Sequence, residues 1–77
     1  MKLELFHAIA NVESARVRKH IAERELLKTV RYRNVVYPEV LADLLAHGGD
    51  ESKVPALWDG EKLHVGADAV IARLTAS

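Results

Sequence analysis

Residues 54–65, VPALWDGEKLHV, carry the strongest folding signal in the chain. Two short apolar runs, ALW and LHV, flank the dipeptide Asp59-Gly60. An Asp-Gly pair between such runs is typical of a β-hairpin, because both residues accept the positive φ angles of tight turns. The stretch therefore predicts two antiparallel strands, with Val54-Pro55 directly before the first of them.

Helical patterns lie on both sides of this hairpin. Residues 39–47 read EVLADLLAH, with Pro38 at a favoured first helical position and Gly48-Gly49 where a helix should end. The apolar face of this helix holds Val40, Leu41, Leu44 and Leu45. Residues 67–75 predict a closing helix, whose apolar face holds Val70, Ile71 and Leu74.

The beginning of the chain predicts a strand and then a helix. Residues 2–7, KLELFH, alternate in the manner of a strand, with Leu3 and Leu5 on one face and Glu4 and Phe6 on the other. Asn11 is a favoured N-cap residue, and Glu13 would place a negative charge in the first helical turn. We expect this helix to run from Val12 to about Leu27, with an apolar stripe of Val17, Ile21 and Leu27.

Residues 29–36, TVRYRNVV, predict a second strand with one solvated face, because two kinds of side chain alternate along it: Val30 and Tyr32, and Arg31 and Arg33. The arginines belong to a basic stretch. Residues 16–33 hold seven basic and two acidic residues, whereas residues 34–77 hold three basic and seven acidic ones. This asymmetry allows either an anionic partner or head-to-tail self-association, or else a solvated helix with arginines that guard an edge strand.

The predicted order is β-α-β-α-β-β-α, in one domain over residues 1–77. Strands that alternate with helices favour a parallel pair in the N-terminal half, and the hairpin adds an antiparallel pair. The fold class is therefore α/β, with a four-stranded mixed sheet and three helices.

Composition removes several classes of function. The net charge is zero and aromatic residues make up 5%, which speaks against a nucleic-acid partner. There is no cysteine, so disulfides and thiolate chemistry are excluded, and a reducing compartment is favoured. The four histidines lack metal-site spacing. With neither a signal peptide nor a membrane-length apolar run, we expect a cytoplasmic protein without a metal or a membrane partner.

The element order, the Val54-Pro55 dipeptide and Gly66 before the last helix resemble the glutaredoxin branch of the thioredoxin fold. Residues 53–63, KVPALWDGEKL, are also similar to the N-terminal domain of glutathione transferases. The resemblance implies a thioredoxin-like fold of the glutaredoxin subtype. It implies that Val54-Pro55 matches a T-V-P segment with a cis proline, and that Val65-Gly66-Ala67-Asp68 matches a G-G-x-D segment.

The same resemblance implies a ligand groove for glutathione. The groove would be lined by residues of three segments. The positions at which glutaredoxins carry C-x-x-C are occupied here by Asn11, Val12, Glu13 and Ser14. The two segments named above contribute Val54, Pro55, Gly66 and Asp68. Dithiol and monothiol exchange need a thiolate, so they are excluded here. The resemblance therefore implies no catalytic residue and no cofactor, with glutathione as a ligand.

Three functions stay open. The first is a non-redox module that binds glutathione, a thiol peptide or a protein segment in this groove. The second is a glutathione-dependent enzyme that activates a thiol with Ser14 or Asn11, and the third is an interaction domain that docks through its basic first helix. The site residues also have structural interpretations, since Asn11 and Ser14 can cap a helix and Asp68 can interact with a helix dipole. The sequence does not predict an oligomeric state.

Overall fold

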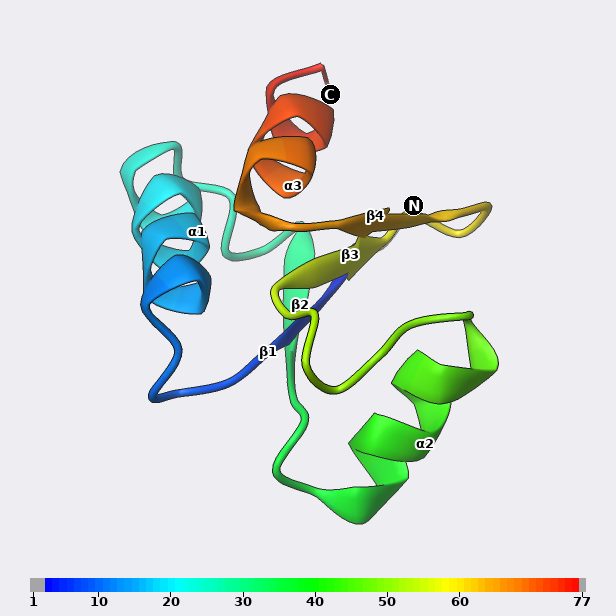
Figure 1. The fold of residues 1–77 in the computed structure, drawn as a ribbon. Helices are drawn as coiled ribbons and strands as arrows, with labels where there is room; N and C mark the ends of the chain where they lie inside the picture. Colours follow the sequence, from blue (N-terminus) through cyan, green and yellow to red (C-terminus); the bar gives the residue numbers. More distant parts are fainter. Residues whose placement is uncertain (1–2, 77) are drawn as a thin grey trace.

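The computed structural model describes residues 3–76, and Figure 1 shows its fold. Within this range the helices and strands follow the predicted order, β-α-β-α-β-β-α. Their bounds are β1 Leu3–His7, α1 Val12–Glu23, β2 Val30–Asn34, α2 Pro38–Ala46, β3 Ala56–Trp58, β4 Leu63–Val65 and α3 Ala67–Thr75. Lys2, predicted to open the first strand, lies outside the described residues.

The described strands form one mixed sheet in the order β2-β1-β3-β4. β1 runs parallel to β2 and antiparallel to β3, and β4 returns antiparallel beside β3. Leu5, at the middle of β1, lies opposite Tyr32 of β2 and Leu57 of β3. The predicted parallel pair and the predicted hairpin are both confirmed.

Strand β1 is buried on both faces. Leu3 and Leu5 pack in a cluster with residues of α1 and α3, whereas Phe6 packs in a second cluster with residues of α2. Figure 1 shows the corresponding layers, with α1 and α3 on one side of the sheet and α2 on the other. Burying a Leu or Phe side chain contributes about 1.5–3 kcal/mol, so β1 is central to the stability of both layers.

Helix α1 starts as predicted and ends earlier. Its last residue is Glu23 instead of a residue near Leu27. Glu25 adopts a positive φ of 56°, and the Leu26 N–H donates to the Ile21 C=O at 2.9 Å, which closes the helix in a Schellman motif. The turn brings Leu26 against the core and leaves Leu27 59% exposed, so the predicted stripe was wrong at Leu27.

Strand β2 is shorter than predicted, and one of its arginines is not solvated. It covers Val30–Asn34, because the chain turns at residues 35 and 36. The Arg33 side chain is only 13% exposed and forms ion pairs with Glu4 of β1 and Asp43 of α2. These ion pairs hold the Arg33 side chain against the sheet. Of the two arginines of β2, only Arg31 is solvated as predicted.

Helix α2 begins at Pro38 and ends at Ala46, one residue before the predicted end. The Gly49 N–H donates to the Leu44 C=O at 2.9 Å, and a Cβ at Gly49 would meet the Leu44 side chain at 2.3 Å. The two glycines therefore end the helix, as predicted. Leu45 is 54% exposed, so its predicted place on the buried face was wrong.

The β3–β4 hairpin is held by the carboxylate of Asp59. Its Oδ1 accepts hydrogen bonds from the N–H groups of Glu61 and Lys62, each at 2.9 Å. Its Oδ2 lies 2.8 Å from His64 Nε2 and 3.1 Å from Arg73 Nε. The Lys62 N–H, the His64 side chain and the Glu61 N–H, followed by Arg73, hold the pKa of Asp59 well below its usual range. The ionised side chain of Asp59 thus links the hairpin turn to His64 of β4 and to Arg73 of α3.

Candidate functional site

The expected site residues come from three segments, and bonds connect these segments. The Gly66 N–H donates to the Pro55 C=O at 2.9 Å, which ties the start of α3 to the residue before β3. Arg16 of α1 and Asp68 of α3 form an ion pair at 2.7 Å. The Val54-Pro55 peptide bond is cis, as the resemblance implies.

Asn11 and Ser14 are used inside the fold. The Asn11 Oδ1 accepts a hydrogen bond from the Ser14 N–H at 2.6 Å, which is the N-cap of α1. Ser14 is fully buried, and its Oγ accepts from the Ala8 N–H at 3.2 Å. The capping interpretation thus accounts for both side chains, while Val12 and Glu13 beside them are exposed.

Asp68 also has a partner inside the chain. Its carboxylate is exposed and bonds to Arg16, whose pKa is raised first by that hydrogen bond and then by the charge of Asp68. Gly66 precedes the helix with a φ of 95°, a conformation that favours glycine, and donates its N–H to Pro55. A ligand at the start of α3 would therefore compete with Arg16 for Asp68.

Val54 differs from the other expected site residues. Within residues 3–76, neither its N–H nor its C=O takes part in a hydrogen bond. Pro55 beside it is fully buried, and its C=O is occupied by Gly66. Val54 thus presents a free backbone donor and a free backbone acceptor directly before β3.

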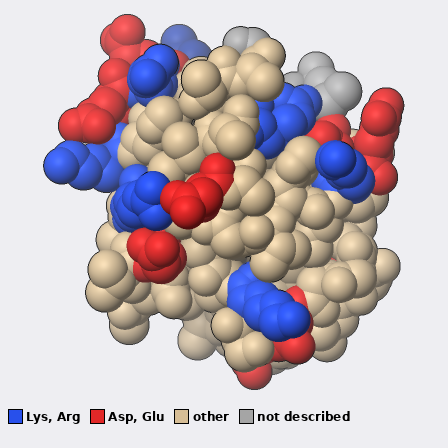
Figure 2. All heavy atoms as spheres, turned by 45° about the horizontal axis from the view of Figure 1, so that its top comes forward, with Lys and Arg blue, Asp and Glu red and all other residues tan. Residues whose placement is uncertain are grey.

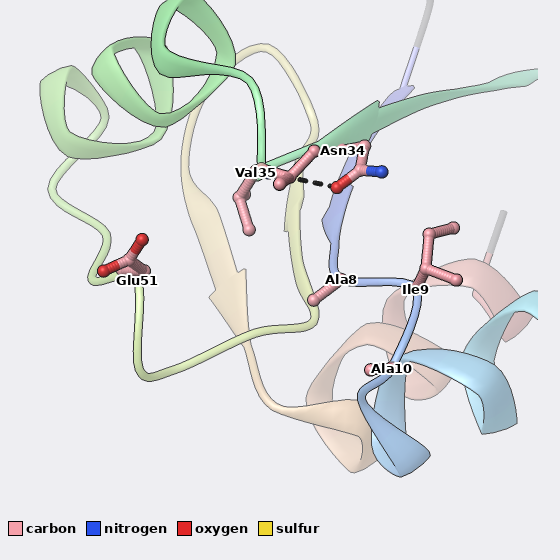
Figure 3. Close-up of a pocket in the computed structure, with 7 residues that line it drawn as sticks. Ala8, Ile9, Ala10, Asn34, Val35 and Glu51 are labelled. Carbon is pink, nitrogen blue, oxygen red and sulfur yellow. Dashed lines mark hydrogen bonds between the residues drawn. The ribbon is translucent and has the colours of Figure 1, made fainter.

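An apolar groove of about 440 Å³ lies at the carboxyl ends of β1 and β2 (Figure 3). It is bounded by the loop after β1, the turn after β2 and the loop after α2: Ala8, Ile9 and Ala10, Asn34, Val35 and Val36, and Glu51. Ile9 is 66% exposed and Val36 72% exposed. Two of these residues, Ala8 and Val35, belong to the same hydrophobic cluster as Val54, although Val54 itself does not line the groove.

None of the expected site residues lines the groove. The topology of the sheet nevertheless indicates a binding site at this position. Ligands of open α/β sheets bind beyond the carboxyl ends of the strands, where consecutive crossovers leave a strand in opposite directions. Here β2 lies on one side of β1 and β3 on the other, so that point is at the end of β1. The sequence predicted the order of the elements along the chain, but only the strand order in the sheet places this point at the end of β1.

Arg18 holds the wall of the groove in place. Its Nη1 lies 2.9 Å from His7 Nδ1 and donates to the Ala8 C=O at 3.2 Å, and its Nη2 donates to the Ile9 C=O at 3.3 Å. A guanidinium only donates, so His7 must accept at Nδ1 and carry its proton on Nε2. Burial, and then the charge of Arg18, lower the pKa of His7 and favour this neutral form.

Three arginines of the basic stretch are bonded within the fold, whereas Lys19, Lys28 and Arg31 are exposed. Arg16 pairs with Glu13 and Asp68, Arg18 bonds the loop after β1, and Arg33 is bound by two carboxylates. Figure 2 shows Lys and Arg interspersed with Asp and Glu on the side of the molecule at the top of Figure 1. Helix α1 therefore does not present a uniformly basic face there.

Among residues 3–76, no group of three His, Asp or Glu side chains is arranged to hold a metal ion. None of the helices in the described part of the chain has the length and apolar character needed to cross a membrane.

Comparison with known protein families, with curated proteins and with solved structures gave no match for this chain. The candidate site therefore rests on the geometry above.

Proposed function

We propose that this chain is a non-enzymatic binding domain with a glutaredoxin-type thioredoxin-like architecture. Its ligand is glutathione, a thiol peptide or an extended segment of a partner protein, bound by the backbone of Val54 and by the apolar groove at the carboxyl ends of β1 and β2. The element order and the strand order β2-β1-β3-β4 support this architecture. The positions of Val54-Pro55 directly before β3 and of Gly66 directly before α3 support it as well.

The free N–H and C=O of Val54 are the observation that carries the proposal. A buried or half-buried backbone group without a partner is costly, and an extended peptide satisfies such a pair by adding alongside it as a short strand. Val54 is half-buried and belongs to the same hydrophobic cluster as Ala8 and Val35, which line the apolar groove. We expect a ligand whose backbone pairs with Val54 to extend toward this groove, where Ile9 and Val36 are exposed.

The alternative of a thiol-activating enzyme has less support. It needs a hydroxyl or amide that faces the ligand, because a thiolate is stabilised by donors aimed at the sulfur. The Ser14 hydroxyl is fully buried beside Ala8, and the Asn11 amide oxygen caps α1. The alternative of docking through α1 has less support as well, since Arg16 and Arg18 are already bonded within the chain.

An amide-shift titration with glutathione tests the proposal. We expect saturable shifts at millimolar ligand for Val54 and for the groove residues of the loops after β1 and β2, with residues 66–68 responding more weakly. Ile9→Glu should abolish the shifts, because it puts a charge into the apolar groove while changing an exposed residue. Leu45→Glu, at an exposed position outside the groove, is the matched control and should bind like the unaltered chain.

Two outcomes would count against the proposal. One is the absence of any shift with both glutathione and an uncharged apolar tripeptide. The other is binding that Ile9→Glu and Leu45→Glu weaken equally, because the groove would then not be the site.

A further inference from the structure

The outer edge of β2 is a second surface on which the backbone is open. β2 is an edge strand, and the longer of the two edges, with five residues against three in β4. The Leu3 N–H donates to the Thr29 C=O at one end of the β1–β2 ladder, and the Val35 N–H donates to the His7 C=O at the other. In a parallel ladder, alternate residues face each neighbour, so residues 29, 31, 33 and 35 point their backbone groups toward β1.

The residues between them point their backbone groups away from the sheet. Within residues 3–76 the N–H of Val30 is bonded to Leu26 and the C=O of Asn34 to Tyr37. The Val30 C=O, both groups of Tyr32 and the Asn34 N–H have no hydrogen bond in this part of the chain. These four groups match the bonding pattern of one further strand.

The side chains at this edge show which strand would fit. Arg31 is exposed and forms no ion pair with a described residue, whereas Arg33 is neutralised by Glu4 and Asp43. Tyr32 lies on the opposite face of the strand, is 36% exposed and packs its ring 5.2 Å from that of His7. An added strand therefore meets the unpaired Arg31 on one face of the sheet and the partly exposed Tyr32 ring on the other.

A second copy of this chain is a poor occupant. Antiparallel pairing of two β2 strands about Tyr32 places Arg31 of each copy opposite Arg33 of the other, where the neighbouring carboxylates of Glu4 and Asp43 already pair with Arg33. Lys28, in the loop before β2, adds a further exposed positive charge near the edge. The charge of Arg31 disfavours pairing of this edge with a basic or apolar strand. The same charge favours pairing with an acidic strand.

We propose that the β2 edge binds an extended acidic segment of a partner protein by strand addition. The segment carries a carboxylate opposite Arg31 and, at the neighbouring position, a β-branched or aromatic residue opposite Tyr32. This edge shares only Asn34 with the groove, so a response at Arg31 and Tyr32, which do not line the groove, distinguishes it from the function proposed above.

The test uses the whole chain labelled with ¹⁵N and an end-capped peptide of alternating valine and glutamate. We expect saturable amide shifts that are largest at Tyr32 and Asn34, whose N–H groups point outward, and smaller at Arg31 and Arg33, whose N–H groups bond β1. Hydrogen exchange at Tyr32 should slow on binding. The same peptide with lysine in place of glutamate should bind at least about fivefold more weakly, as expected for a reversed surface charge pair.

Variants separate this surface from a general charge effect. Arg31→Glu should weaken binding of the glutamate peptide by about fivefold or more and reverse the preference between the two peptides. Lys19→Glu, at another exposed basic position on α1, is the matched control and should change the affinity little. Equal losses for the two variants would overturn the proposal, as would shifts centred on β4 or equal binding of both peptides. Concentration-dependent dimers that protect the Tyr32 amide without peptide would also overturn it.

Discussion

The two ends of the sheet differ in how many of their polar groups are hydrogen-bonded within the chain. At the hairpin end, one carboxylate, that of Asp59, meets two backbone N–H groups and the side chains of His64 and Arg73. At the end where β1 leads into its loop, the backbone of Val54 is unpaired within the described residues and an apolar groove stands open. The hydrogen bonds of Asp59 stabilise the hairpin end. The groove end leaves the N–H and C=O of Val54 available to a ligand.

The largest effect should come from the strand that joins both ends. Phe6→Ala removes a fully buried ring that packs beside His47, which in turn stacks on Trp58 at 3.8 Å. We expect a loss of about 3–5 kcal/mol in the free energy of unfolding, measured by urea denaturation. Tyr37→Ala, at a position 55% exposed, is the control and should stay within about 0.5 kcal/mol. A loss for Phe6→Ala as small as that of the control would mean that the α2 layer does not depend on β1.

A smaller effect, confined to stability, is expected at the hairpin end. Asp59→Asn keeps one acceptor oxygen but turns an amide toward Arg73, so it should lower the melting temperature and leave ligand binding in the groove unchanged. The pKa of Asp59 lies below the 3.8 of an unfolded carboxyl, so its contribution is complete above that pH and is lost as the pH falls toward the lowered pKa. The variant should therefore lose less stability than the unaltered chain on acidification.

Asp50→Asn provides the comparison for that experiment. Asp50 also accepts hydrogen bonds in a turn, from the N–H and the hydroxyl of Ser52, but it is exposed. We expect a smaller drop in melting temperature than for Asp59→Asn. If the two variants were equally stable, the Asp59 network would not be what distinguishes the hairpin end.

Acid should act on the groove end through His7. Its pKa is lowered from 6.5, so the neutral form contributes stability that is complete above about pH 6.5 and is lost as the pH falls toward the lowered pKa. Protonation places a donor against Arg18, which must then release the loop after β1. At neutral pH, NMR should show His7 protonated on Nε2 alone. As the pH falls, a second proton should appear on Nδ1, and the amide signals of Ala8 and Ile9 should shift.

Arg18→Gln sharpens the same comparison. Removing the guanidinium should raise the pKa of His7 toward its usual value and cost about 1 kcal/mol through the lost hydrogen bonds. Lys19→Gln removes a neighbouring charge that does not bond the loop, and it should leave the His7 titration unchanged. Equal effects of the two substitutions would refute the role assigned to Arg18.

The cap of α1 should have an effect on stability as small as that of Arg18→Gln. Asn11→Ala is expected to cost about 1 kcal/mol because the Ser14 N–H loses its acceptor, whereas Asn11→Ser should retain most of the stability. Ligand affinity should follow stability only weakly, since Asn11 acts as a cap. Full stability combined with abolished binding in Asn11→Ala would instead make Asn11 a ligand contact.

Local signals in the chain predicted most of the fold. Asp59-Gly60 predicted the hairpin, Asn11 the start of α1, Gly48-Gly49 the end of α2, and the alternation of residues 3–6 the two faces of β1. Each depends on interactions within a few residues, which sequence reasoning handles well. The errors at Leu27 and Leu45 arose where a helix face was assigned by spacing alone, although a turn at Glu25 and the limits of the α2 interface decide which side chain is covered.

By itself, the sequence determined the class of chemistry and the order of the elements: a chain without cysteine cannot exchange thiols, and its periodicities specify strands and helices. Only the tertiary structure decided which polar groups are used up and which remain free. Ser14 and Arg33 became internal, whereas the backbone of Val54 and the edge of β2 stayed open. The physical reason is that a hydrogen bond between residues far apart in the chain depends on how the layers pack, and no local pattern encodes that packing.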